Sequence, residues 1–239
     1  MSGRDWIGVG LFFLYFILGA GVIAVISSLI KIPQEFRRKA YHLMACGSIL
    51  VLLWHFDNWY GALTAIGLFL VAVYAVVPAA MRLFSFKHIT VQRGGSIKEL
   101  LYQASVFLLT LGLLIAVIWG LIGEEHKLHI LIGVTALSLG DAAAALIGRH
   151  FGKNKLRFKL FDPNKTVEGS LGMIGFAFIG IFTLLLVYTD LSMGTAFFSA
   201  LLLAIVSAIV EAAAVHGSDT VLIPVIVSFA SLGLLFLVS

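Results

Sequence analysis

Two carboxylates lie inside apolar runs of this sequence, where acids are unusual. Asp141 sits within the run Leu128–Ile147, and Glu211 lies one helical turn from the end of the run Thr195–Val215. An acid surrounded by lipid or by a protein interior is costly and by default marks a functional site. A structural ion pair or an interhelical hydrogen bond is the alternative for each of them.

A polar stretch at residues 162–170 has the composition of a phosphate-binding helix start. It reads Asp-Pro-Asn-Lys-Thr-Val-Glu-Gly-Ser. The Asp-Pro pair before an apolar run predicts the beginning of a helix, and the free N–H groups at a helix N-terminus favour phosphate. Lys165 would add a positive charge, while Thr166 and Ser170 would add hydroxyl groups. Gly169 would let a ligand approach the backbone. The alternative is a capped helix whose lysine reaches the membrane surface.

Small residues flank Asp141. Gly140, Ala144 and Gly148 recur every four residues, which places them on one face of a helix. Such a face lets another helix pack closely in a membrane. Because Asp141 borders this face, we expect its side chain to point into the bundle and away from lipid. Packing alone explains the small residues, but it does not explain an acid among them.

A basic cluster precedes the second apolar run. Arg38 and His42 are four residues apart, so they share a helical face, and Lys39 adds a further charge. This cluster favours a phosphate ligand, although a histidine near a helix end is often merely interfacial. The chain has no Walker A motif, no Gly-x-Gly-x-x-Gly motif and no zinc-ligand spacing. A nucleotide site here would therefore be of another kind.

The amino-acid composition is typical of an integral membrane protein. Of the 239 residues, 61% are hydrophobic and 12% are charged, whereas soluble domains have about 45–50% and about 25%. Apolar runs long enough to cross a bilayer predict an all-α polytopic membrane bundle of about eight helices. The run 41–56 is short, and it spans only if the basic residues at 37–39 form its first turn and reach outward. The predicted spans are Trp6–Ile30, Tyr41–Phe56, Trp59–Leu83, Leu100–Ile122, Leu128–Ile147, Leu171–Tyr188, Thr195–Val215 and Val221–Val238.

The basic residues predict an orientation. With eight spans, fourteen of the sixteen Lys and Arg residues fall in loops on one side, and Arg4 and Lys127 fall on the other. The positive-inside rule makes the crowded side cytoplasmic and places both termini outside. The net charge of +4 then reflects these loops and anionic lipid, so no nucleic acid partner is expected. We expect residues 1–239 to form a single membrane-embedded domain.

Five blocks, in this order and spacing, resemble the family of phytol kinases, dolichol kinases and CTP-dependent diacylglycerol kinases. The resemblance runs from residue 37 to residue 224, and in the last block Thr220 stands where the family usually has asparagine. The blocks are Arg38-Lys39-x-x-His42, Lys98-Glu99-Leu-Leu, Gly140-Asp141 through Gly148-Arg149 and Gly152, Lys165-Thr166-x-Glu168-Gly169-Ser170, and Glu211 followed by Asp219 and Ile223-Pro224.

The resemblance implies a polytopic enzyme that phosphorylates a lipid alcohol (an isoprenoid alcohol or diacylglycerol), typically with CTP and a divalent cation such as Mg²⁺. Its site would lie on the cytoplasmic face, among membrane lipids. Oligomeric state is left open. The catalytic candidates are Asp141, Lys165 and His42, with either Asp141 or His42 as base. The nucleotide-binding candidates are Arg38, Lys39, Arg149, Lys165, Thr166, Gly169 and Ser170. The metal-binding candidates are Asp141, Glu168, Glu211 and Asp219.

Two other functions fit the same residues. A CTP:lipid-phosphate cytidylyltransferase would use a similar acidic, cation-dependent site in the membrane. An ion-coupled transporter would use Asp141 and Glu211 as proton or ion relays near the membrane midplane. The placement of both acids toward the cytoplasmic ends of their helices, beside a helix start of the phosphate-binding type, argues against transport.

Overall fold

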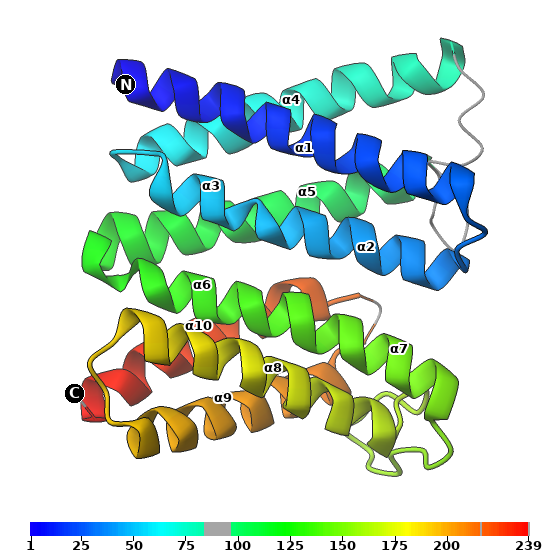
Figure 1. Cartoon of the computed structure of the whole chain (residues 1–239), viewed down its shortest axis with the longest axis vertical. Helices are drawn as coiled ribbons and strands as arrows, with labels where there is room; N and C mark the ends of the chain where they lie inside the picture. The colour runs from blue at the N-terminus through cyan, green and yellow to red at the C-terminus, as the bar shows by residue number, and fades with distance from the viewer. Residues whose placement is uncertain (84–96, 216, 239) are drawn as a thin grey trace. The chain divides into compact units, whose positions relative to one another are not determined.

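The computed structural model describes residues 1–83, 97–215 and 217–238, and it shows an assembly of helices (Figure 1). The side chains of residues 80–83 are outside that description. The chain divides into two compact units, residues 1–121 and 122–239. The predicted all-α polytopic bundle is confirmed. A single domain over residues 1–239 remains a prediction, and Lys87, Arg93 and His216 lie outside the described residues.

Within the described residues, seven helices are long and apolar enough to cross a membrane, as a multi-pass membrane protein requires. They agree with seven of the eight predicted spans to within a few residues at most ends. They cover Gly3–Leu29, Trp59–Ala79, Ile97–Ile122, Glu124–Phe151, Val167–Tyr188, Met193–Ala213 and Asp219–Val238.

The remaining predicted span, residues 41–56, is part of a helix pair outside those seven. Helix α2 (Gln34–Gly47) is followed by α3 (Ile49–Trp54), with Ser48 in helical conformation between them. Helix α2 already begins at Gln34, so of the basic residues at 37–39 only Arg37 falls in its first turn, and Lys39 is buried at 3% exposure. The condition that these residues form the first turn and reach outward is therefore not met by Lys39.

Unit 1 contains these two helices with α1 (Gly3–Leu29), α4 (Trp59–Leu83) and α5 (Ile97–Leu114). A π-helical segment, η1 (Ile115–Ile122), extends α5. Helix α1 packs on α2, α3 and α4, and α4 also packs on α5. Aromatic rings fill the contact between α1 and α4, where Phe12 and Phe16 both meet Phe69. In Figure 1 these helices run across the picture in alternating directions, and α2 and α3 together make one complete pass across unit 1.

Unit 2 begins with one long helical stretch, residues 124–151. It is made of η2 (Glu124–His126), α6 (Lys127–Thr135), the π-helical segment η3 (Ala136–Asp141) and α7 (Ala142–Phe151). Three further helices follow, α8 (Val167–Tyr188), α9 (Met193–Ala213) and α10 (Asp219–Val238). The segment η3 contacts α8, α9 and α10, so Asp141 at its end lies where the helices of unit 2 converge.

The small residues around Asp141 have the packing role that the sequence predicts. Helices α7 and α8 pack together, and a Cβ atom built on Gly148 would lie 3.4 Å from the Cα of Gly169. A Cβ atom built on Gly140 would lie 2.9 Å from the terminal methyl of Met173, also on α8. The side chain of Asp141 is only 6% exposed. The acid therefore points into the bundle, as expected.

Candidate functional site

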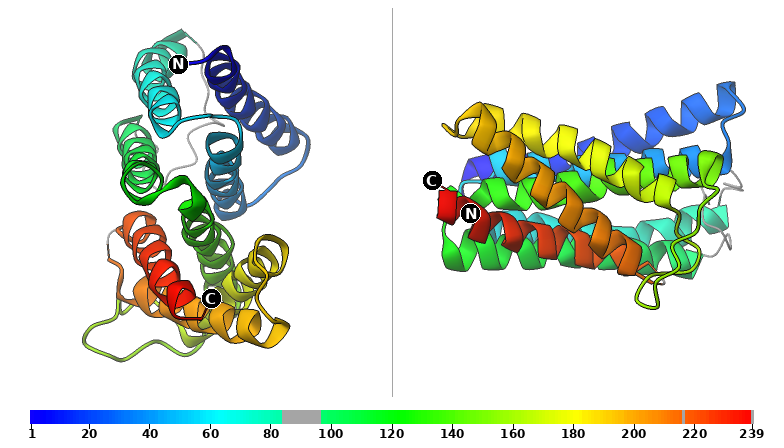
Figure 2. Two further views of the ribbon diagram at one scale, coloured as in Figure 1. Left: turned by 90° about the vertical axis from the view of Figure 1, so that its left-hand side faces the viewer. Right: turned by 90° about the horizontal axis from the view of Figure 1, so that it is seen from below.

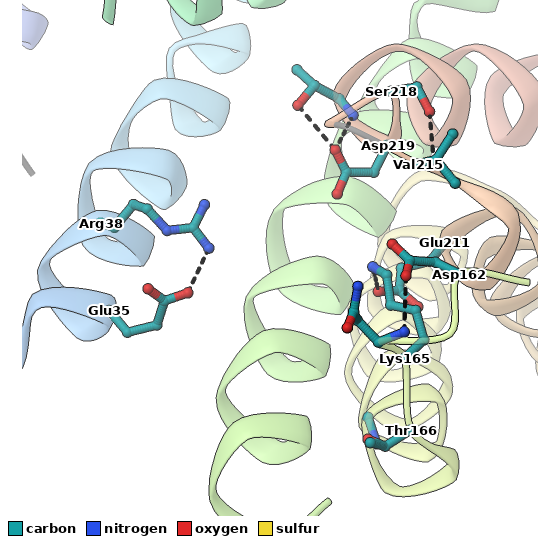
Figure 3. A network of polar contacts seen from close by, with 12 residues as sticks. Glu35, Arg38, Asp162, Lys165, Thr166, Glu211, Val215, Ser218 and Asp219 are labelled. Atoms are coloured by element: carbon teal, nitrogen blue, oxygen red, sulfur yellow. Dashed lines mark hydrogen bonds and ion pairs between the residues drawn. The ribbon is translucent and has the colours of Figure 1, made fainter. Parts of the chain in front are cut away.

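Lys165 and Glu211 form an ion pair at one end of unit 2 (Figure 3). Lys165 comes from the loop before α8, and Glu211 lies in the last turn of α9. The carboxylate of Glu211 is 4% exposed and the ammonium side chain of Lys165 is 24% exposed. The sequence identified both residues as candidates but predicted them for different ligands. The structure instead brings them together.

Two further acids surround this pair. Asp141 and Asp219 lie close enough to Lys165 to act on its charge. Burial disfavours the charged form of Lys165, but Glu211, and then Asp219 and Asp141, outweigh burial and raise the pKa of Lys165 above its ordinary value. One carboxylate, that of Glu211, is paired with Lys165, and those of Asp141 on η3 and Asp219 on α10 act on its charge from farther away. We call Asp141, Lys165, Glu211 and Asp219 the acid–lysine cluster.

Backbone hydrogen bonds hold Lys165 in place. The Asp162 N–H donates to the Ala212 carbonyl of α9 at 2.9 Å, and the Lys165 N–H donates to the Asp162 carbonyl at 3.0 Å. The carboxylate of Asp162 accepts the Asn164 N–H at 2.8 Å. The Asp-Pro pair thus makes a tight turn against the end of α9, and the prediction that it begins the helix was wrong.

Helix α8 instead begins at Val167, because Thr166 caps it. The Thr166 hydroxyl accepts the Gly169 N–H at 3.2 Å, which satisfies one of the free donors of the first turn. Gly169 faces α7, where a Cβ atom would lie 3.1 Å from the Ala144 carbonyl. The hydroxyl oxygen of Ser170 is buried without a hydrogen-bond partner. Thr166 and Gly169 therefore have structural roles. The hydroxyl of Ser170 is available to form a hydrogen bond with a ligand.

Glu168 points to a different partner from the other predicted metal ligands. Its carboxylate accepts the Asn154 side-chain amide at 2.8 Å and the Asn154 backbone N–H at 3.2 Å. These bonds tie the loop after α7 to the first turn of α8. Among residues 1–83, 97–215 and 217–238, no three His, Cys, Asp or Glu side chains are grouped to hold a metal ion. The predicted four-acid ligand set is therefore not assembled as a group.

Asp219 is the first residue of α10, whereas the sequence predicted it in the preceding loop. Its carboxylate accepts the backbone N–H of Thr220 at 2.8 Å (Figure 3). The residue is half-buried. Arg149, in the last turn of α7, is exposed.

The remaining candidates belong to unit 1 and share helix α2. Arg38 forms an ion pair with Glu35 at 2.7 Å, and Glu35 is buried. Lys39 is also buried, and the ring of His42 approaches the sulfur of Cys46 at 3.8 Å. Sequence reasoning missed Glu35, although its spacing of three residues from Arg38 on a helix was a readable signal.

A family model described as the Cytidylyltransferase family matches residues 6–213. This match includes the first span, which the blocks seen in the sequence leave out. The chain is 28% identical over 177 residues to the phytol kinase of Synechocystis sp., covering 73% of this chain and 69% of that protein. These two findings confirm the resemblance to the phytol kinase-like family that the sequence blocks carry. No solved structure matches the chain.

Proposed function

The chain belongs to the Cytidylyltransferase family, and from this membership we propose that it is a membrane lipid kinase. It transfers the terminal phosphoryl group of a nucleoside triphosphate, CTP by family resemblance, to the hydroxyl of an isoprenoid alcohol or of diacylglycerol. The similarity to a phytol kinase supports the lipid-alcohol acceptor. The observation that carries the proposal is the acid–lysine cluster, because phosphoryl transfer depends on positioned cations and acids.

Lys165 is the residue we assign to the donor phosphates. It precedes α8 directly, so its ammonium and the free N–H groups of the first turn of α8 lie at the same helix end. Ser170 adds a buried hydroxyl without a partner. On binding, the phosphates replace Glu211 as the partner of the Lys165 ammonium. Lys165 therefore passes from one anion to another, which avoids leaving its charge unpaired.

We assign to two of these acids a divalent cation that is brought in with the nucleotide, because the described residues do not group three acids into a metal site of their own. Proteins often hold Mg²⁺ through one or two carboxylates, while substrate phosphates and water complete the shell. Asp141 and Asp219 would hold the ion in this way, with Glu211 available once Lys165 has moved. The bound ion would neutralise charge that develops on the phosphates. Glu168 is not needed for this site, because it holds Asn154.

The acceptor hydroxyl must lose a proton as its oxygen bonds to the terminal phosphorus. The bond from that phosphorus to the bridging oxygen breaks, and the nucleoside diphosphate leaves with the bonding electrons. Asp141 and His42 are the two candidates for the proton acceptor. Asp141 lies within the acid–lysine cluster, which favours it. The basic loops support a cytoplasmic site, where soluble nucleotides are available.

A second function, cytidylyl transfer to a lipid phosphate, is favoured by the description of the matching family. It would use the same cluster but would break the bond between the α- and β-phosphates. CTP labelled at the γ- or at the α-position separates the two reactions with purified protein and a panel of lipid alcohols and lipid phosphates. Label in lipid from the γ-position supports the kinase, and label from the α-position supports the alternative. Transfer of neither label contradicts both.

A further inference from the structure

Residues 153–161, between α7 and α8, combine strong positive charge with exposed apolar side chains. The segment reads Lys-Asn-Lys-Leu-Arg-Phe-Lys-Leu-Phe, with four cations and no acid. All four basic side chains are exposed, and Phe158 and Leu160 are 70% and 84% exposed. It lies outside the spanning helices, at the end of unit 2 where α7 ends and α8 begins (Figure 2). We call it the basic–aromatic arm.

The arm alternates in sequence between the two kinds of side chain. Basic residues occupy positions 153, 155, 157 and 159, and apolar residues occupy positions 156, 158 and 160. In an extended chain, neighbouring side chains point to opposite faces. The first part of the arm has such a pairing, because Lys155 forms a β-bridge with Thr166. The last part of the arm is a turn in which the Phe161 N–H donates to the Phe158 carbonyl at 3.1 Å.

Hydrogen bonds hold the arm at the level where α8 enters the membrane. The Val167 N–H, the first of α8, donates to the Asn154 carbonyl at 2.8 Å, and the Leu156 N–H donates to the Lys165 carbonyl at 3.0 Å. Leu160 is four residues beyond Leu156, so it reaches about 14 Å from that anchor at most. The headgroup layer on one side of a bilayer is roughly 5–7 Å thick. A reach of about 14 Å exceeds this thickness, so the apolar side chains of the arm can reach the membrane surface from their anchor at the start of α8.

We propose that the basic–aromatic arm binds anionic phospholipid headgroups of the surrounding bilayer. Phe158 and Leu160 insert at the boundary between headgroups and acyl chains, while Lys155, Arg157 and Lys159 pair with lipid phosphates. This arrangement covers the exposed apolar surface and matches the charge of the arm with that of the leaflet. The proposal goes beyond the proposed function and uses none of its chemistry. It depends on the membrane topology and on the exposure of these side chains.

The test measures the depth of a nitroxide label on Phe158→Cys in the full chain. The protein is reconstituted into vesicles of phosphatidylcholine alone, or of phosphatidylcholine with a minority of phosphatidylglycerol. Collision with oxygen, which concentrates in lipid, is compared with collision with a water-soluble nickel complex. The parent chain gives the labelling background, since its single cysteine, Cys46, is buried. Leu160→Cys repeats the measurement at the second apolar residue.

In anionic vesicles we expect the ratio of oxygen to nickel collisions at Phe158→Cys to rise several-fold over that in neutral vesicles. The added substitutions Lys155→Gln, Arg157→Gln and Lys159→Gln should abolish the rise. A label at Asp190→Cys, in the exposed turn between α8 and α9, should stay accessible to water in both vesicles. These three results together support the proposal.

Three outcomes overturn it. The label on the arm could remain accessible to water in anionic vesicles. It could be equally deep in neutral vesicles and in the glutamine variant, which would exclude a role for anionic lipid. It could be shielded from both reagents, which would place a second copy of the chain over the arm. No step of the test measures phosphoryl transfer, so its failure and the failure of the proposed kinase activity are distinguishable.

Discussion

Lys165 and Glu211, 46 residues apart in the chain, form an ion pair in which the carboxylate is almost completely buried. Lys165→Met removes the charge but keeps the length of the side chain. We expect it to destabilise the protein by about 3 kcal/mol, because it leaves a buried carboxylate without this cation. If Lys165 binds the donor phosphates, kcat/KM should also fall by at least about 10²-fold. Thermal unfolding in detergent and lipid phosphorylation assays measure the two effects.

The double variant Lys165→Met with Glu211→Leu separates the two roles. Removing both charges should recover most of the lost stability, because no unpaired carboxylate remains at position 211. It should not recover activity, since the phosphate-binding cation is still missing. Lys165→Arg should also recover little activity, because a planar guanidinium replaces a compact ammonium. Near-normal activity in the double variant would contradict the assignment of Lys165 to the phosphates.

Asp141→Asn keeps the shape of the side chain and removes its charge. We expect the thermal stability to change little and the rate to fall by at least about 10²-fold, as for loss of a metal ligand or a catalytic base. A Mg²⁺ titration should show a higher cation requirement if Asp141 is a ligand. Asp190→Asn, in an exposed turn of the same unit, is the matched control and should keep its activity. A normal rate for Asp141→Asn at every Mg²⁺ concentration would show that Asp141 has only a packing role.

Two glycines of α8 test the close approach of α7 and α8. A Cβ atom at Gly169 would lie 3.1 Å from both the Ala144 carbonyl and the Thr166 hydroxyl, so Gly169→Ala must push the helices apart. We expect a loss of about 1–3 kcal/mol in unfolding free energy. Gly175→Ala, where nothing lies within 4 Å, should be neutral or stabilising. Equal effects of the two substitutions would show that α7 and α8 tolerate a wider separation.

The uneven placement of the basic residues predicts the orientation in the membrane. A tag after Ser239 should be labelled from outside intact cells, because the eight predicted crossings would return the chain to the side on which it began. A reporter in the arm, on the other side, should be labelled only in inverted vesicles. Labelling of the C-terminal tag from the cytoplasmic side alone would require an odd number of crossings or the opposite orientation.

Local features of the sequence predicted local features of the structure. The lengths of the apolar runs predicted the spans, and the four-residue spacing of small residues predicted the helix face that packs on α8. Both features depend only on residues that are close in the chain. The partner of Lys165 was missed because no periodicity links positions 165 and 211. The start of α8 was missed because two signals compete there. Asp162 closes a turn with its backbone, and Thr166, four residues later, has the side chain that caps the helix.

The π-helical segment η3 affects the direction in which the side chain of Asp141 points. On α6, Gly133 faces Ser228 of α10, whereas on α7, Gly148 faces Gly169 of α8. The wider turns between them hold more residues than α-helical turns would, and π segments of this kind are frequent at functional sites. If the same residues were wound as a regular α-helix, everything beyond them would be rotated by about 100° relative to α6, which is the turn of one residue. The helix would keep its length nearly unchanged, yet Asp141 would turn away from the interior of unit 2 in which it is buried. The position of this acid therefore depends on one extra residue in the middle of a span.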